Sequence, residues 1–91
     1  MKWIEVIRLR SVGKGSHLLE EFLLSINKST QSELVEVKTY SHASLETDVS
    51  VHLHWESERL GQNRSALGFR IAQALKEFGL IDHSVWVEKE K

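Results

Sequence analysis

The sequence predicts an α+β sandwich in which four antiparallel strands form one sheet and two helices cover one of its faces. The first observation is the order of periodic segments, which runs strand, helix, strand, strand, helix, strand. The second is their spacing, since helices that follow strands at these short distances favour this arrangement. The third is the length of 91 residues, without proline or a low-complexity stretch, which fits one domain over residues 1–91.

The first strand and the first helix are expected over residues 2–10 and 17–27. Residues 2–10 are rich in β-branched and aromatic side chains, which favour strands. This strand is apolar on both faces, with Trp3, Ile7 and Leu9 on one and Ile4 and Val6 on the other. A turn follows, in which Ser16 can serve as the helix N-cap. Helical spacing then aligns one apolar stripe, formed by Leu19, Phe22, Leu23 and Ile26.

Residues 33–42 and 48–56 are expected to form a hairpin, because both segments alternate apolar and polar residues and only residues 43–47 separate them. Pairing residue 42 with residue 48 fixes the register, since a slip by one position would expose the apolar set. The face toward the helices then carries Val35, Val37, Val49, Val51, Leu53 and Trp55. The other face carries Glu36, Lys38, Tyr40, His42, Ser50, His52, His54 and Glu56.

A longer helix is expected from Ser57 to Phe78, followed by a last strand over residues 81–88. The apolar face of this helix comprises Leu67, Ile71, Ala74, Leu75 and Phe78. Gly79 directly follows this helix, and we expect it to be a C-cap in the left-handed conformation. The last strand directs Ile81, Val85 and Val87 to one face and Trp86 to the other. In the spatial order 4-1-3-2 that is usual for this topology, half of the helix-free sheet face is apolar, and a second subunit is its expected cover.

Composition excludes several classes of protein. The chain has no cysteine, so it can form neither disulfides nor thiolate-ligated metal sites. Its net charge of −1 provides no electrostatic attraction for nucleic acid. No apolar run exceeds three residues, as in Phe22-Leu23-Leu24, which is too short for a transmembrane helix or a secretory signal. We expect a cytoplasmic protein that binds neither nucleic acid nor a membrane.

His52 and His54 are candidate metal ligands, because residues two apart on a strand share a face and start about 6–7 Å apart. Two imidazoles so placed can share a metal ion if a third ligand converges on it. The hairpin register, however, places Lys38 opposite His52 and Glu36 opposite His54. A cation beside the pair opposes metal binding, and a glutamate–histidine pair across two strands needs no metal. We therefore expect a polar sheet surface and no metal.

The turn Gly13-x-Gly15-Ser16 before the first helix could offer backbone N–H groups to an anion. It lacks the full phosphate-loop pattern, because no glycine stands five residues before a Gly-Lys-Ser/Thr sequence. We interpret the segment as a turn and a helix N-cap.

The segment HWESERLGQNRSALGF, residues 54–69, together with the order of elements, resembles the antibiotic biosynthesis monooxygenase family. Members of that family commonly have a strand that ends in Trp, a Ser/Glu-rich helix start, and a His six residues before a Phe. Trp55, Glu56, Ser57 and Phe69 match this pattern, whereas position 63 is Asn in place of the His. The resemblance covers most of the chain by topology and about sixteen residues by motif.

The resemblance implies a ferredoxin-like protomer that dimerises sheet against sheet into a dimeric α+β barrel. It also implies a ligand pocket between sheet and helices, and the residues we expect there are Trp55, Asn63, Phe22 and Leu60. Some members oxidise aromatic polyketides without metal or flavin, and others degrade haem. The haem-degrading branch has an Asn on the first strand and a Trp and a His on the second helix. This sequence has none of them there, so no cofactor is expected.

The expected function is binding of a small apolar or aromatic ligand by a homodimer, with cofactor-independent oxidation as the chemistry if the protein is an enzyme. In that case Trp55 would be a wall of the pocket and Asn63 a hydrogen-bond donor. Equally, Trp55 can be a core aromatic that fills the gap under the long helix, and Asn63 can cap that helix. The alternative is a non-catalytic regulatory module of ACT type. ACT domains share the βαββαβ order and bind amino acids near the first turn, although the Asp and Pro often found in that turn are absent here.

Overall fold

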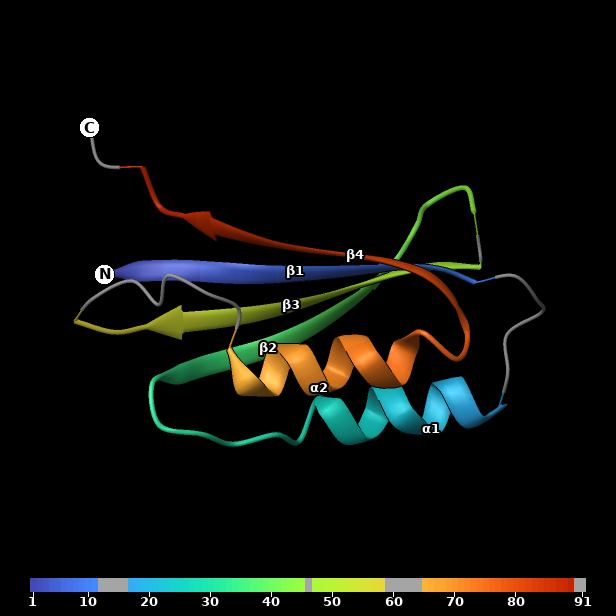
Figure 1. The fold of residues 1–91 in the computed structure, drawn as a ribbon, viewed down its shortest axis with the longest axis horizontal. Coiled ribbons are helices and arrows are strands. Elements are labelled where there is room, and N and C mark those ends of the chain that lie inside the picture. The colour runs from blue at the N-terminus through green and yellow to red at the C-terminus, as the bar shows by residue number, and fades with distance from the viewer. Residues whose placement is uncertain (12–16, 46, 59–64, 90–91) are drawn as a thin grey trace.

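The computed structural model describes residues 1–11, 17–45, 47–58 and 65–89. It contains the six expected elements in the expected order (Figure 1). They are β1 (Lys2–Ser11), α1 (His17–Ile26), β2 (Leu34–Ser41), β3 (Asp48–Glu56), α2 (Ala66–Leu75) and β4 (Gly79–Val87). Neither helix in the described part of the chain has the length and apolar character needed to cross a membrane.

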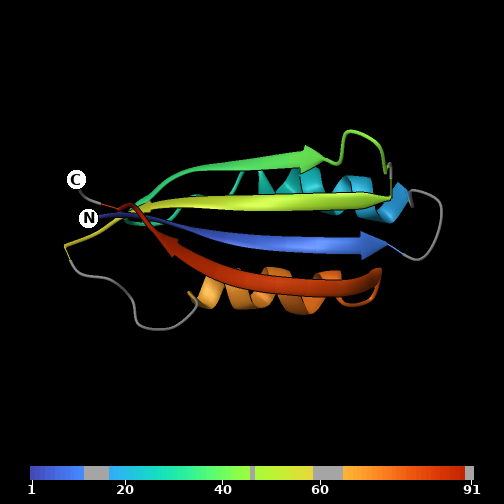
Figure 2. The same ribbon diagram turned by 90° about the horizontal axis from the view of Figure 1, so that it is seen from above.

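The strands form one antiparallel sheet in the order β2-β3-β1-β4, which confirms the predicted fold class. Both helices lie on the same face of this sheet (Figure 1). Viewed from the opposite side, α1 lies behind β2 and β3, and α2 lies behind β1 and β4 (Figure 2). We call the uncovered side the helix-free face.

The hydrophobic core fills the space between the sheet and the two helices. β1 and β3 are the central strands, and their helix-side residues include Ile7 and Leu53, which are fully buried. The stripe expected on the first helix buries Leu19, Leu23 and Ile26, with Phe22 half-buried at its edge. α2 buries Leu67, Gly68, Ile71, Ala72 and Leu75. The core is thus complete within one chain on this side of the sheet.

The hairpin has the predicted register, with Tyr40 paired to Ser50, Lys38 to His52 and Glu36 to His54. One residue departs from the predicted faces. An irregularity between Leu34 and Glu36 shifts the first residues of β2, so Leu34 pairs with Trp55 and packs on the core. Val35 is consequently 62% exposed, and its assignment to the buried set was wrong.

The second helix is shorter than expected. Ser57 does not begin it, because its backbone N–H donates to the Met1 carbonyl and its hydroxyl accepts from Trp3 Nε1, both beside β1. The helix begins after Ser65, whose side chain caps it by accepting from the Gly68 N–H at 2.9 Å. It ends at Leu75, so Phe78 lies in the following turn and packs on the core from there.

Gly79 is not the left-handed C-cap that was expected, since no described glycine has a positive φ. It begins β4, opposite Ser11 at the end of β1. A Cβ atom at this position would lie 2.1 Å from the Arg10 carbonyl oxygen. Glycine is needed here because the two backbones approach closely, and not for a turn.

Candidate functional site

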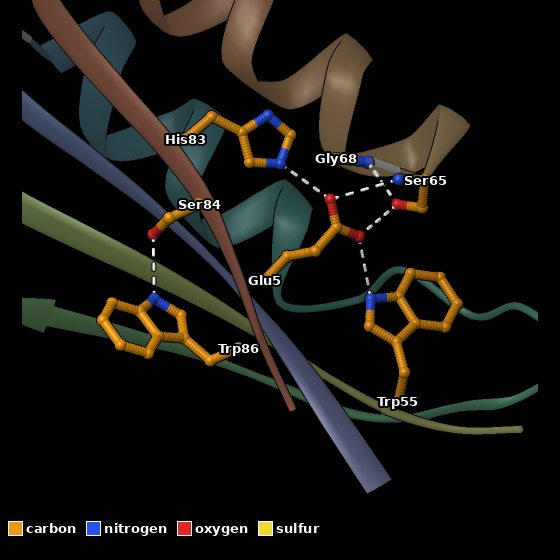
Figure 3. Close-up of polar contacts among 7 residues, drawn as sticks. All are labelled: Glu5, Trp55, Ser65, Gly68, His83, Ser84 and Trp86. Carbon is orange, nitrogen blue, oxygen red and sulfur yellow. Dashed lines mark hydrogen bonds and ion pairs between the residues drawn. The ribbon is translucent and has the colours of Figure 1, made fainter. Parts of the chain in front are cut away.

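A buried carboxylate lies on the helix side of the sheet, in the middle of β1. Glu5 has no exposed surface. Its Oε1 accepts a hydrogen bond from Trp55 Nε1 at 2.9 Å and one from the Ser65 hydroxyl (Figure 3). Its Oε2 accepts from the Ser65 backbone N–H at 3.2 Å and lies 2.7 Å from His83 Nε2. These contacts satisfy both oxygens, as a buried carboxylate requires.

Glu5 also lies at the N-terminus of α2, where the helix dipole favours a negative charge. The approach is possible only because position 68 is glycine. A Cβ atom on Gly68 would lie 2.1 Å from Glu5 Oε2. Glu5 thus connects β1 and β4 to the start of α2, and through Trp55 to β3.

The arrangement of these groups argues against nucleophilic catalysis. In a catalytic triad the histidine lies between the hydroxyl and the carboxylate, so that it can take the hydroxyl proton. Here Glu5 lies between Ser65 and His83, so this carboxylate separates the imidazole from the hydroxyl. The four residues connect secondary-structure elements, and we call Glu5, Trp55, Ser65 and His83 the Glu5 cluster.

This cluster was not predicted from the sequence, although the alternation along two strands contains a signal for it. Alternation along β1 places Glu5 on the same face as Trp3, Ile7 and Leu9, so an acidic residue interrupts an otherwise apolar face. His83 likewise shares its face with Ile81 and Val85 on β4. A charged or polar residue within an apolar strand face predicts a buried, partnered group.

The helix-free face carries both apolar and polar residues, arranged in rows across the sheet. Ile4 and Val6 of β1 are half-buried on it. Trp86 of β4 pairs with Ile4 and is 60% exposed, and its Nε1 donates to Ser84 Oγ at 2.9 Å (Figure 3). Toward the other end of β4 is Leu80, also largely exposed. The expected apolar half of this face is therefore present, with Ile4 and Val6 as its β1 members.

A hollow of about 430 Å³ lies on this face, beside the loop between β2 and β3. The loop rises on the side of the sheet away from the helices (Figure 1). The side chains that line the hollow on this face are Arg8, Arg10, Tyr40, His42, Leu45, Asp48, Ser50, Leu80 and Asp82. Two arginines and two aspartates give the lining equal numbers of positive and negative side chains, and Leu45 and Leu80 give it apolar walls. A second hollow of about 140 Å³ lies on the helix side, against α1.

Hydrogen bonds orient two polar groups at the large hollow. His42 Nδ1 accepts from the backbone N–H groups of Ser44 and Leu45 at 3.0 and 3.1 Å. Because Nδ1 is an acceptor, the proton of the neutral ring is on Nε2, which can donate to another group. Arg10 Nε lies 3.8 Å from Asp48 Oδ2, a partly exposed ion pair across β1 and β3.

The histidine pair lies in the middle of the helix-free face. The rings of His52 and His54 are 6.4 Å apart, and His52 Nε2 lies 2.8 Å from Ser50 Oγ. Tyr40 packs beside His52 with ring centroids 4.7 Å apart. Burial, with a smaller contribution from His54, lowers the pKa of His52 from the usual 6.5. Among the described residues no group of three potential ligands converges on a metal site, and the expected absence of a metal stays a prediction.

The four residues predicted for a ligand pocket are only partly described. Asn63 and Leu60 lie outside the described residues, as do the turn glycines and Ser16. Trp55 is on the helix side as expected, 6% exposed, stacked on Trp3 with ring centroids 5.4 Å apart. Trp55 and Phe22 line neither of the hollows described above, which are formed by residues in the described part of the chain. The pocket between sheet and helices therefore stays a prediction.

Comparison with protein-family models, with curated proteins and with solved structures finds no match to this chain. The resemblance to the antibiotic biosynthesis monooxygenase family accordingly stays a prediction.

Proposed function

We propose that this chain is a cytoplasmic ligand-binding protein that acts as a homodimer, with two sheets packed through their helix-free faces into an α+β barrel. The observation that carries the proposal is the coincidence of an apolar patch and a hollow on one sheet face. Ile4, Val6 and Trp86 form the patch, and the hollow of about 430 Å³ lies on the same face toward the β2–β3 loop. A second copy would cover both.

Burial of the patch supplies the driving force for the dimer. Covering a large apolar side chain stabilises an association by roughly 1.5–3 kcal/mol. A face that meets its own copy makes a closed, self-complementary contact with two subunits. The ligand that suits the hollow is small and apolar or aromatic, because Leu45, Leu80 and the ring of Tyr40 offer apolar contact area. Its polar groups would meet the charged and polar side chains of the lining.

Light scattering coupled to size-exclusion chromatography tests the dimer. We expect the protein to elute as a dimer at micromolar concentration and the Trp86→Glu variant to elute as a monomer. Phe69→Glu is the matched control, because Phe69 is 52% exposed on α2, on the other side of the sheet. A monomeric parent protein, or equal effects of the two substitutions, would contradict the proposal.

Mass spectrometry of small molecules extracted from the purified protein tests ligand binding. We expect an apolar or aromatic compound that is lost in a Tyr40→Ala/Leu80→Ala variant and kept in Leu24→Ala, which changes an exposed leucine on α1. Oxygen uptake with that compound, in the absence of metal and flavin, would extend the proposal to the oxidation that the family resemblance implies. Tight binding of an amino acid without turnover would favour the ACT-like module instead.

A further inference from the structure

We infer that the second copy docks about a two-fold axis that runs along the strands, between β1 and β3, and that the hollows of the two copies then join into one chamber. The inference rests on the homodimer proposed above and adds its geometry. It follows from the charges on the two central strands, which lie side by side in the middle of the helix-free face (Figure 2).

The two central strands carry opposite charges at both ends of their pairing. Lys2 of β1 is opposite Glu56 of β3, and at the other end Arg10 of β1 is opposite Asp48 of β3. A two-fold axis along the line between the strands places each β1 residue over the β3 residue with which it pairs, but in the other copy. Arg10 then faces the partner's Asp48, and Lys2 faces the partner's Glu56. Both ends of the contact are attractive.

The alternative axis lies across the strands and reverses one sheet end for end. It brings Lys2 toward the partner's Arg10 and Asp48 toward the partner's Glu56, so like charges meet at both ends. Charge complementarity therefore selects the axis along the strands, since like charges placed opposite one another disfavour an orientation. Packed sheets lie about 10 Å apart with their strands within about 30° of each other. Lysine and arginine are long enough to span such a gap from either side.

We call the residues that pair with one another across the four strands a row. With this axis, each row of one sheet lies over the same row of the partner's sheet. Val6 lies over the partner's His52, and Asp82 lies over the partner's Tyr40, whose hydroxyl can donate to the carboxylate. The hollow occupies the rows of Tyr40 and His42, so it lies over the partner's hollow. The ligand chamber is then lined by residues from both copies, and either chain alone supplies only half of it.

Charge reversal at Arg10 and Asp48 tests the axis, read out as the dimer dissociation constant by sedimentation. We expect Arg10→Glu alone and Asp48→Lys alone each to weaken the homodimer about tenfold or more, because every two-fold pair becomes repulsive. An equimolar mixture of the two variants should form a heterodimer more tightly than either homodimer. Arg70→Glu is the control for net charge, because Arg70 is exposed on α2.

The outcomes separate the axis from the dimer itself. A tighter homodimer in Arg10→Glu, whose new carboxylate would meet the partner's Lys2 across the other axis, would overturn the inference and leave the dimer standing. So would an unchanged dissociation constant in both variants, or a mixture that forms no heterodimer. A monomeric parent would overturn both proposals. Should either variant fail to fold by circular dichroism, Lys2→Glu and Glu56→Lys make the same comparison at the other end, with both residues exposed.

Discussion

The two faces of β1 differ in a way that reverses the usual pattern. On the helix side its middle residue is Glu5, fully buried, with hydrogen-bond partners for both carboxylate oxygens. On the other side its middle residues are Ile4 and Val6, half-buried, and none of the described helices and strands lies over them. In the middle of this strand, therefore, a charged residue is inside and two apolar residues are outside, although the rest of the strand follows the usual pattern. The helix side buries the hydrophobic core, whereas the helix-free face leaves Ile4 and Val6 half-buried and Trp86 exposed, which is why we propose a partner for it.

The largest effect is expected when charges placed on the two sides of β3 are compared. Val51 is fully buried on the helix side, and its neighbour Ser50 lies on the helix-free face. Val51→Asp should unfold the domain, because an unpaired charge in the core costs several kcal/mol against a total stability of about 5–15 kcal/mol. Ser50→Asp should melt close to the parent. Thermal unfolding followed by circular dichroism measures both.

The difference in melting temperature between the Val51 and Ser50 variants tests whether the two faces of β3 differ in burial. A Val51→Asp protein that melts within a degree or two of the parent would show that the helix side is not the core. A Ser50→Asp protein as unstable as Val51→Asp would show that the helix-free face tolerates a charge no better than the core does.

A smaller but more specific effect is expected at Gly68. In most helices a glycine-to-alanine change stabilises, by up to about 1 kcal/mol. Here the added Cβ would meet Glu5 Oε2, so Gly68→Ala should destabilise the protein by about 1–3 kcal/mol. Glu5→Ala should cost about 3–5 kcal/mol, because it leaves the buried Trp55 N–H and His83 without their acceptor.

A double-mutant cycle at Gly68 and Glu5, measured by denaturant unfolding, separates the two causes. In the Glu5→Ala background the Cβ no longer has a carboxylate to meet, so Gly68→Ala should become neutral or stabilising. Additive losses in the double variant would show that Gly68 is required for a reason other than the approach of Glu5.

The alternation of apolar and polar residues along the strands predicted most of the fold. The errors arose where this alternation, or the spacing of apolar residues along a helix, is interrupted. The hairpin register follows from alternation on two strands joined by a short loop, and it is confirmed. Val35 was misplaced because an irregularity in β2 shifts one residue, and alternation alone does not reveal a bulge. Ser57 was placed at the start of the second helix, whereas its hydrogen bonds connect it to Trp3 of β1 and to Met1.

The Glu5 cluster could be predicted only in part. Glu5 and His83 each share a strand face with apolar neighbours, which indicates two buried polar residues, one on β1 and one on β4. Their pairing requires that β1 and β4 be adjacent, which follows from the strand order. The role of Ser65 depends on where α2 begins, and the sequence prediction began this helix at Ser57, whereas Ser65 is its N-cap.

The smallest effect is expected at His52, and it has a defined sign. Burial first, and His54 second, lower the pKa of His52 in the folded protein below the usual 6.5. The unfolded chain therefore binds this proton more readily, so the stability that His52 contributes is complete above pH 6.5 and is lost as the pH falls through the lower folded-state pKa. The other polar side chains beside His52 on the helix-free face are His54 on the same strand and Glu36, Lys38 and Tyr40 on β2.

We expect the stability of the protein, and with it the proposed dimer, to weaken from pH 7 toward pH 5. His52→Gln should flatten this slope in both thermal unfolding and light scattering, because glutamine keeps a polar side chain on the face without a proton to gain. A slope that is unchanged in His52→Gln would assign the pH dependence to another group and would leave the helix-free face insensitive to the protonation of His52.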